Sequence, residues 1–278
     1  MEIICYNEDY IDKSKFSIPI ENRAFRYGDS FFETIKCSLG KPLFLKEHYF
    51  RIASSFCIMK MTHPLTFNIE KLEILIQQLL IKNKLDIKPA RVRMSFFRSD
   101  GGYYMPKTNQ VNFIIESDSL SHEKYQINTH GLQVGLYKDN LIPKQNLSNI
   151  KSNNRLLNVL ASLYAKENNY DDCVLINVDK KIIECISGNL FIVFENSIKT
   201  PPLDDGCIDG VMRRVILDIT DFNIEESSIS LSDIFNAEEV FITNVIRGVQ
   251  WVSEIDTNRY HNETSVRVLE LLNKKYLV

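Results

Sequence analysis

Apolar side chains in the first half of the chain recur with the period of a helix in two places and of a strand in a third. Over residues 45–59 and again over 69–79 they return every three or four positions, which predicts two helices with one buried face each. Apolar and polar residues alternate over 90–96, which predicts a strand. A further strand is predicted over residues 33–36. The run 111–115 is predicted to be the hairpin partner of the strand over 90–96.

A second domain is predicted to follow, because residues 117–123 are polar and unpatterned. We predict a smaller N-terminal α+β domain over 1–119 and a larger C-terminal α+β domain over 120–278. The elements predicted beyond this boundary are a strand near 132–137, a helix near 154–167, a strand-rich run over 172–199, a helix over 210–219, a strand over 239–243 and a helix over 265–276. Strands outnumber helices without regular alternation, so the fold class is predicted to be α+β rather than a doubly wound parallel sheet.

Composition and charge argue against several classes of protein. The 278 residues include 33 basic and 36 acidic side chains, for a net charge of −3, so we expect no general binding of nucleic acid. Hydrophobic residues make up 44% and charged residues 25%, an ordinary globular balance that argues against disorder. No apolar run approaches the ~20 residues of a membrane span, so no membrane association is expected. The acidic start of the chain does not resemble a secretory signal.

The spacing of cysteine and histidine bears on location and metal binding. Six cysteines are scattered without a C-x-x-C pair, which favours reduced thiols and a cytoplasmic protein. The five histidines never lie four positions apart, so no metal site is expected. Glycine motifs of dinucleotide and P-loop sites and the G-x-S-x-G elbow are absent. Arg91, Arg93 and Arg98 beside nearby aromatic residues could form a nucleic-acid stacking face, but an exposed strand edge over core aromatics is favoured.

Five segments together resemble one family. They read RYGDSFFET over 26–34, EHYFR over 47–51, IKSNNRL over 150–156, ECISGNLF over 184–191 and DGVMR over 209–213. In order and spacing they are similar to the class IV aminotransferases, the fold type IV enzymes that use pyridoxal 5'-phosphate. The resemblance implies a two-domain, D-amino-acid aminotransferase-like enzyme with the cofactor site between its domains. It also implies a small-molecule amino substrate and a homodimer.

Lys151 matches the catalytic lysine of the family, which forms a Schiff base with the cofactor and then moves a proton. Taken alone, Lys151 would be read as a surface lysine. The residues after it, 152–154, are types that cap helices, so we predict that Lys151 lies in a strand end or turn just before a helix.

The other cofactor contacts are also implied by the resemblance. Glu184 matches the carboxylate that faces the pyridine nitrogen, and Arg51 matches the arginine that binds the phosphate, which a guanidinium fork suits. Arg51 neighbours Ile52 on the apolar side of its predicted helix, which predicts an inward reach. The remaining matches provide phosphate-binding N–H groups or lie close to the ring; these are Ser187, Gly188, Asn189, Val211, Met212, Asn244 and Val245.

Within the family, the short motifs are most similar to those of the 4-amino-4-deoxychorismate lyases. The Asn-Arg-Leu after the lysine, the Met-Arg over 212–213 and the Asn-x-x-Arg-Gly over 244–248 all match, whereas the arginine of the lyase motif Gly-Gly-Arg-Gly-Tyr is missing over 101–104. Phe32 stands where D-amino-acid aminotransferases have a tyrosine that helps to hold the substrate carboxylate. We therefore expect a lyase that releases pyruvate and 4-aminobenzoate.

Two alternatives stay open at this point. One is a branched-chain or D-amino-acid aminotransferase that uses a 2-oxo acid acceptor, and the other is a protein that binds the cofactor without turnover. Candidate residues for binding the substrate carboxylate are Arg98, Arg155 and Arg247, among which the sequence does not decide.

Overall fold

The two amphipathic stretches of the first half form helices in the computed structural model, which describes residues 2–64, 66–195, 197–219 and 221–277. They are α2 (Leu45–Ile58) and α3 (Ile69–Lys82). Contacts divide the chain into unit 1, which contains Met1–Glu123 and Lys151–Asn154, and unit 2, which contains Lys124–Ile150 and Arg155–Val278. The lysine segment therefore belongs to unit 1, although its neighbours on both sides in the sequence belong to unit 2.

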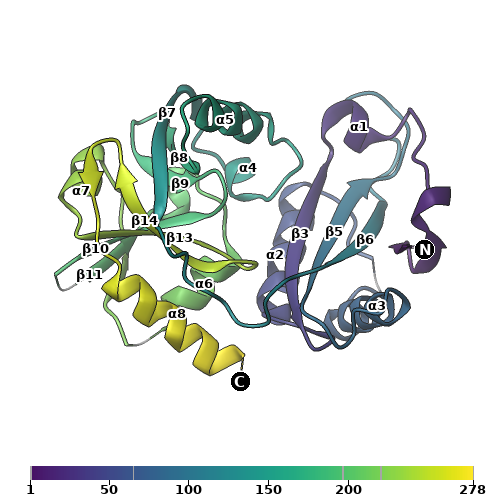
Figure 1. Ribbon diagram of the computed structural model, residues 1–278. Helices are drawn as coiled ribbons and strands as arrows, with labels where there is room; N and C mark the ends of the chain where they lie inside the picture. The colour runs from purple at the N-terminus through teal and green to yellow at the C-terminus, as the bar shows by residue number, and fades with distance from the viewer. Residues whose placement is uncertain (1, 65, 196, 220, 278) are drawn as a thin grey trace. The chain divides into compact units, whose positions relative to one another are not determined.

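Unit 1 is built on an antiparallel sheet in the order β2-β1-β6-β5-β3-β4. The strands are β1 (Ile3–Tyr6), β2 (Asp9–Asp12), β3 (Ser30–Ser38), β4 (Lys41–Pro42), β5 (Ala90–Arg98) and β6 (Val111–Ser119). Helix α2 contacts β3, and α3 contacts α2, β1 and β6, so both helices cover one face of the sheet (Figure 1). A short helix, α1 (Arg23–Tyr27), precedes β3, and a single 3-10 turn, η1 (Lys13–Lys15), follows β2.

Aromatic rings fill the space between α2 and the sheet. Phe31 of β3 stacks on Phe96 of β5 with ring centroids 4.9 Å apart. Phe56 of α2 meets both rings edge-on at 5.2 Å. All three side chains are buried. The alternation that predicted β5 thus places one apolar set against the helices and leaves the polar set, which includes Arg91 and Arg93, on the other face of the sheet.

Unit 2 contains a mixed sheet of nine strands, in the order β12-β11-β10-β13-β14-β7-β8-β9 with β15 paired to β14. Three strand pairs are parallel, namely β11 with β12, β14 with β7 and β7 with β8. The strands are β7 (Leu132–Ile142), β8 (Asp172–Asn177), β9 (Ile182–Cys185), β10 (Asn189–Phe194), β11 (Ser197–Thr200), β12 (Ile224–Glu226), β13 (Glu239–Asn244), β14 (Gly248–Ile255) and β15 (Asn258–Arg259). This mixed arrangement confirms the α+β class.

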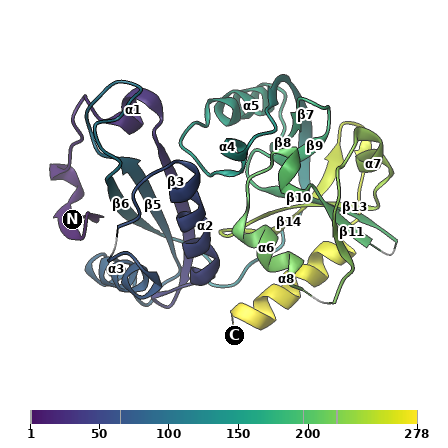
Figure 2. The same ribbon diagram turned by 180° about the vertical axis from the view of Figure 1, so that it is seen from behind.

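Unit 2 also contains helices, several of which pack on the mixed sheet. They are α4 (Asn146–Asn149), α5 (Leu156–Glu167), α6 (Val211–Leu217), α7 (Leu231–Asn236) and α8 (Glu263–Tyr276), with a 3-10 turn, η2 (Leu203–Asp205), between β11 and α6. Helix α5 contacts β7 and β8, α6 contacts β13, and α8 contacts β13 and β14. Figure 2 shows α6 and α8 from the opposite side. No helix among the described residues is both long and apolar enough to cross a membrane.

The predicted helices and strands form, whereas the strand β14, of eight residues, and several short elements were not predicted. Helices α1 and α7 have five and six residues, too few for a helical period to show in the sequence. The β1–β2 hairpin turns through Asn7 and Glu8, which both have positive φ angles, and this dipeptide is not a typical hairpin turn signal. Length and turn chemistry therefore explain these omissions.

Candidate functional site

Residues 151–154 are tied to the start of β3 within unit 1. The backbone N–H of Phe32 donates to the Lys151 carbonyl oxygen at 2.9 Å, and the N–H of Asn153 donates to the Ser30 carbonyl oxygen at 3.0 Å. The Asn153 side-chain amide also donates to the Ser30 hydroxyl at 2.7 Å. Because the backbone is held on both sides of Ser152, the half-buried Lys151 side chain starts from a fixed point.

This arrangement corrects the capping role expected for residues 152–154. Helix α5 begins at Leu156, and its N-cap is Arg155 without a side-chain capping bond. Asn153 bonds β3 instead, and the Asn154 amide donates to the Gly28 carbonyl oxygen at 3.4 Å. Lys151 does lie just before a helix, as predicted, but asparagines that could cap α5 hold the lysine segment to unit 1.

Two cations approach the ring of Phe32. Lys151 Nζ lies 4.8 Å from the ring centroid, and the guanidinium carbon of Arg93 lies 3.8 Å from it. Arg93 Nη2 also donates to Asn153 Oδ1 at 3.3 Å. Burial, with a smaller contribution from Arg91, lowers the pKa of Arg93 from its ordinary value. Arg93 and the predicted catalytic lysine thus both lie over the ring of Phe32.

Sequence reasoning did not select Arg93 as a site residue. It had assigned this arginine to an exposed strand edge, although β5 is an interior strand of its sheet, paired with both β3 and β6. The register aligns Arg93 with Thr34 on β3, next to Phe32 on the same face. A signal was present, because charged residues on a strand bordered by strands on both sides are costly unless they have a partner.

Arg51 is buried, as its predicted inward reach requires, and it forms an ion pair with Glu33. Its Nε donates to Glu33 Oε1 and its Nη2 to Glu33 Oε2, both at 2.6 Å. His48, one helical turn earlier on α2, places Nδ1 2.6 Å from Glu33 Oε2. Glu33, His48 and Arg51 are 1%, 0% and 5% exposed.

The charges of this buried cluster fix its ionisation states. Burial alone would raise the pKa of Glu33, but the Arg51 guanidinium and the His48 hydrogen bond together lower it to about 2. Burial lowers the pKa of His48 despite the attraction of Glu33. At neutral pH, the cluster therefore holds a carboxylate, a guanidinium and a neutral imidazole, with Nδ1–H of His48 donating to Glu33.

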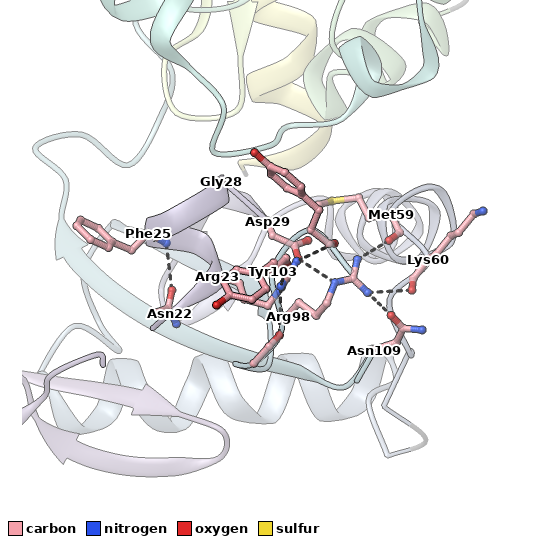
Figure 3. Close-up of polar contacts among 12 residues, drawn as sticks. Asn22, Arg23, Phe25, Gly28, Asp29, Met59, Lys60, Arg98, Tyr103 and Asn109 are labelled. Carbon is pink, nitrogen blue, oxygen red and sulfur yellow. Dashed lines mark hydrogen bonds and ion pairs between the residues drawn. The ribbon is translucent and has the colours of Figure 1, made fainter. Parts of the chain in front are cut away.

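Arg98, a candidate for substrate binding, has a structural role instead. Its Nε donates to Asp29 Oδ2 at 2.9 Å, and its Nη2 donates to the Met59 carbonyl oxygen at 2.7 Å, at the end of α2. Nη1 donates to the Lys60 carbonyl oxygen and to Asn109. Figure 3 shows this fan of contacts around the guanidinium. Since every nitrogen of the buried Arg98 side chain donates to the protein, it is a poor candidate for binding the substrate carboxylate.

Asp29 joins Arg98 to a second buried arginine, Arg23, whose Nε donates to Asp29 Oδ2 at 2.8 Å (Figure 3). Arg23 Nη1 donates to the carbonyl oxygens of Gly101 and Tyr103 at 3.2 and 2.6 Å. The glycine-rich turn between β5 and β6 is therefore held by its backbone, while the Tyr103 side chain is exposed.

The other two candidate arginines lie in unit 2. Arg155 Nη2 donates to the Ile150 carbonyl oxygen at 2.5 Å and is half-buried. Arg247 is exposed and lines a surface pocket with Ser187, Asp172 and Lys166. Neither contact selects one of these two arginines for the substrate.

Glu184 and Asn189 of unit 2 hold the segment that enters α6. The N–H of Ile208 donates to Glu184 Oε2, and the Asn189 amide donates to the Ile208 carbonyl oxygen, both at 2.8 Å. Glu184 is 3% exposed. A Cβ on Gly210 would lie 1.8 Å from Asn189 Oδ1, so a larger residue at this helix start would displace the Asn189 side chain. These contacts bring the predicted ring-facing carboxylate and the predicted phosphate helix together.

The first hydrogen bond of α6 runs from the Arg214 N–H to the Gly210 carbonyl oxygen. The N–H groups of Val211 and Met212 precede this bond and are not used within the helix. Their side chains are buried and anchor α6. The helix start can therefore offer backbone donors to an anion.

The turn between β9 and β10 packs against the end of β13. The Asn244 amide donates to the Ser187 carbonyl oxygen at 3.1 Å, and the same side chain accepts from the N–H groups of Ile246 and Arg247. A Cβ on Gly188 would lie 2.3 Å from the Thr243 carbonyl oxygen. Packing against β13 therefore explains this glycine, which the sequence analysis had attributed to close approach of the ring.

Asp172 and Tyr125 support these loops and were not found from the sequence. Asp172 is buried and accepts from the Ser187 hydroxyl at 2.5 Å and the Ile186 N–H at 2.9 Å. Tyr125 donates its hydroxyl to the Val245 carbonyl oxygen at 2.9 Å. In unit 2, eight of the predicted residues are thus gathered in connected loops; they are Glu184, Ser187, Gly188, Asn189, Val211, Met212, Asn244 and Val245. Arg51 and Lys151 lie in unit 1.

Comparison with known proteins gives consistent results. The sequence model described as amino-transferase class IV matches residues 30–255. The chain is 26% identical to the aminodeoxychorismate lyase of Vibrio harveyi, covering 86% of this chain and 87% of the relative. It is 25% identical to a putative branched-chain-amino-acid aminotransferase of Methanocaldococcus jannaschii, covering 98% and 94%. Among solved structures, the branched-chain aminotransferase of Thermoproteus uzoniensis with norvaline has a TM-score of 0.88 at 18% identity, covering 98% and 94%.

The pKa of Glu33 leads to a prediction on acid stability. Because folding lowers this pKa from 4.5 to about 2, the stabilisation from Glu33 is complete above pH 4.5 and is lost as the pH falls toward 2. Glu33→Gln should lower the free energy of unfolding at neutral pH by about 3–5 kcal/mol, since it breaks a buried ion pair. It should also flatten the loss of stability in acid.

Urea unfolding at a series of pH values measures both effects. Glu70→Gln is the matched control, because Glu70 is an exposed residue in the first turn of α3. An acid-induced loss as steep in Glu33→Gln as in the wild type would contradict the lowered pKa.

Proposed function

Because the chain belongs to the class IV aminotransferase family, whose cofactor is pyridoxal 5'-phosphate, we propose that it is an enzyme in which Lys151 is the catalytic residue. When bound, the cofactor supplies an aldehyde that reacts with amines and a ring that takes up an electron pair. We further propose that the principal reaction is the elimination of pyruvate from 4-amino-4-deoxychorismate. The ring of Phe32 beside Lys151 and Arg93 is the observation that carries this choice.

The donors in both units fit this cofactor. Lys151 is half-buried with a fixed backbone, which suits an amine that must both bind covalently and move a proton. The N–H groups of Val211 and Met212, which precede the first hydrogen bond of α6, suit a phosphate. Glu184 is buried with an N–H donor on one oxygen, so it is an oriented carboxylate suited to a protonated pyridine nitrogen. These features support the assignment of the ten cofactor-binding residues expected from the sequence.

In this proposal, the site residues divide into those that move or hold a proton and those that bind the cofactor. Lys151 Nζ takes the proton from the substrate carbon that bears the amino group, and Glu184 holds the proton on the pyridine nitrogen. Arg51 in unit 1 and the N–H groups of Val211 and Met212 in unit 2 are the ligands that would hold the phosphate. Ser187, Gly188, Asn189, Asn244 and Val245 form the loops beside them.

Elimination is favoured by the surroundings of the lysine in unit 1. At the position of Phe32 an aromatic ring without a hydroxyl lies near the amine, so a donor for an α-carboxylate is missing there. Arg93 instead offers a guanidinium next to the same ring, which suits a carboxylate remote from the amino group. A ring diacid has such carboxylates, and binding them would place its C–H bond beside Lys151 Nζ.

The bond changes in the substrate balance without a second reactant. The C–H bond beside the amino group breaks, the adjacent C–O bond breaks, and the enolpyruvyl group leaves and takes up a proton as pyruvate. The ring becomes aromatic, which drives the step, and 4-aminobenzoate is released. The lyase relative from Vibrio harveyi supports this reading, whereas the relative from Methanocaldococcus jannaschii supports amino transfer as the second candidate.

A homodimer is proposed as well, with one observation in its support. Helix α5 exposes Leu156, Val159, Leu160 and Leu163, which lie three and four positions apart and so share one face of the helix. An apolar stripe of this kind suits a second copy of the chain. The mass of the protein in solution tests it.

The first expected outcome concerns the reaction. Incubation with 4-amino-4-deoxychorismate should release pyruvate and 4-aminobenzoate in equal amounts without any added 2-oxo acid, because elimination needs no amino acceptor. A panel of branched-chain and D-amino acids with 2-oxoglutarate serves as the comparison. Faster turnover of one of those amino acids, or product that forms only with an added acceptor, would show that the chain is an aminotransferase.

The second expected outcome concerns Arg93. Arg93→Leu should lower kcat/KM for the diacid substrate roughly ten- to a hundredfold, since it removes one charge-assisted hydrogen bond to a carboxylate. Cofactor affinity should not change. Arg91→Leu is the matched control, because Arg91 lies two residues earlier on β5 and its Nη1 is 3.9 Å from Asp118. Equal losses in both variants would argue for a general effect of charge on this face of the sheet.

A further inference from the structure

Glu33 occupies an apolar surface of β3. Its neighbours on the same face of the strand are Phe31 and Ile35, and both are buried against the helices. A carboxylate in such surroundings is costly unless its hydrogen bonds are complete. Three short contacts from α2, one from His48 and two from Arg51, meet this need. The cluster of Glu33, His48 and Arg51 therefore joins α2 to β3, and it also contains the proposed phosphate ligand, Arg51.

The geometry of the ion pair sets the direction of the guanidinium. Glu33 accepts hydrogen bonds from Nε and Nη2 of Arg51, so one edge of the planar guanidinium faces the carboxylate. The Nη1 end points away from that edge, because the group is rigid and flat. A side-on pair of this kind restricts rotation of the guanidinium, so Glu33 helps to set the direction of Nη1.

His48 in turn fixes Glu33. Its ring lies on the same face of α2 as Arg51, three positions earlier, and its Nδ1 contacts the carboxylate oxygen that also receives Arg51 Nη2. Nε2 of this buried ring has no hydrogen-bond partner among the described residues. A single donated bond to Glu33 is therefore the polar contact that holds the imidazole, which fits a support for the carboxylate.

We propose that Glu33 is a positioning residue for anion binding, which aims Arg51 at the cofactor phosphate while His48 holds the carboxylate in place. This inference rests on the proposed function, in which Arg51 binds that phosphate. It assigns a site role to two residues that touch neither cofactor nor substrate.

A structural role and a positioning role have different consequences. If the cluster only joins α2 to β3, its loss weakens the protein and affects ligands with and without a phosphate equally. If Glu33 aims Arg51, its loss weakens binding of the phosphorylated ligand alone. Charge acts in the opposite direction, because removing a carboxylate strengthens the attraction of a cationic site for phosphate. A fall in phosphate selectivity therefore reports orientation.

The test compares pyridoxal 5'-phosphate with pyridoxal, which lacks the phosphate. Dissociation constants of the 278-residue chain for both ligands are measured by calorimetry, with the folded fraction of each variant determined by circular dichroism. The variants are Glu33→Gln, Glu33→Asp and Arg51→Ala. Asp29→Asn is the control, because it removes another carboxylate that pairs with buried arginines in unit 1 (Figure 3).

We expect the selectivity for the phosphorylated ligand to fall by about tenfold in Glu33→Gln, comparable to one charge-assisted hydrogen bond. Arg51→Ala should lower it at least as much, and Asp29→Asn should leave it unchanged. Glu33→Asp keeps the charge but shortens the arm, so it should lower the selectivity too, and it provides the answer if Glu33→Gln does not fold.

The outcomes separate the two claims. Selectivity that is unchanged or raised in both Glu33 variants, together with a loss in Arg51→Ala, would overturn the positioning role and leave Arg51 as the phosphate ligand. Unchanged selectivity in Arg51→Ala would overturn the phosphate role itself. An equal loss in Asp29→Asn would show a general effect of buried ion pairs and would also overturn the inference.

Discussion

Two backbone hydrogen bonds and one side-chain hydrogen bond tie residues 151–154 to the start of β3. Because of this short pairing, the lysine segment belongs to unit 1, although its neighbours in the sequence belong to unit 2. The pairing places Lys151 over the ring of Phe32 and lets Asn153 accept a hydrogen bond from Arg93. The proposed chemistry depends on it, because a lysine that must move a proton needs a fixed starting point.

Buried ion pairs organise the rest of unit 1. Asp29 joins Arg23 and Arg98, and Glu33 joins Arg51 to β3. Such pairs add little net stability relative to apolar packing, since desolvation offsets most of the attraction, but removing one partner is costly. Their main effect here is on orientation. The Asp29 network holds the glycine-rich turn and the end of α2, and the Glu33 network orients the guanidinium of Arg51.

The sequence predicted most of the long elements. Helices α2 and α3 showed a clear apolar period, and the motifs around Glu184 and Gly210 pointed to residues that the structure places in connected loops of unit 2. It did not separate Arg98, which has a structural role, from Arg93, which we propose as a substrate ligand, because the two differ only in which partners the fold brings to them. Nor could it foresee that Asn153 bonds β3 instead of capping α5, since capping residues also pair well with strand backbone. Contacts between residues far apart in sequence decide both points.

Reduction of the loaded protein with borohydride, followed by peptide mass analysis, tests the central claim most directly. The cofactor should be recovered on the peptide that contains Lys151, and Lys151→Ala should show no such adduct although it remains folded. An adduct on a different lysine, or one retained in Lys151→Ala at the wild-type level, would contradict the account.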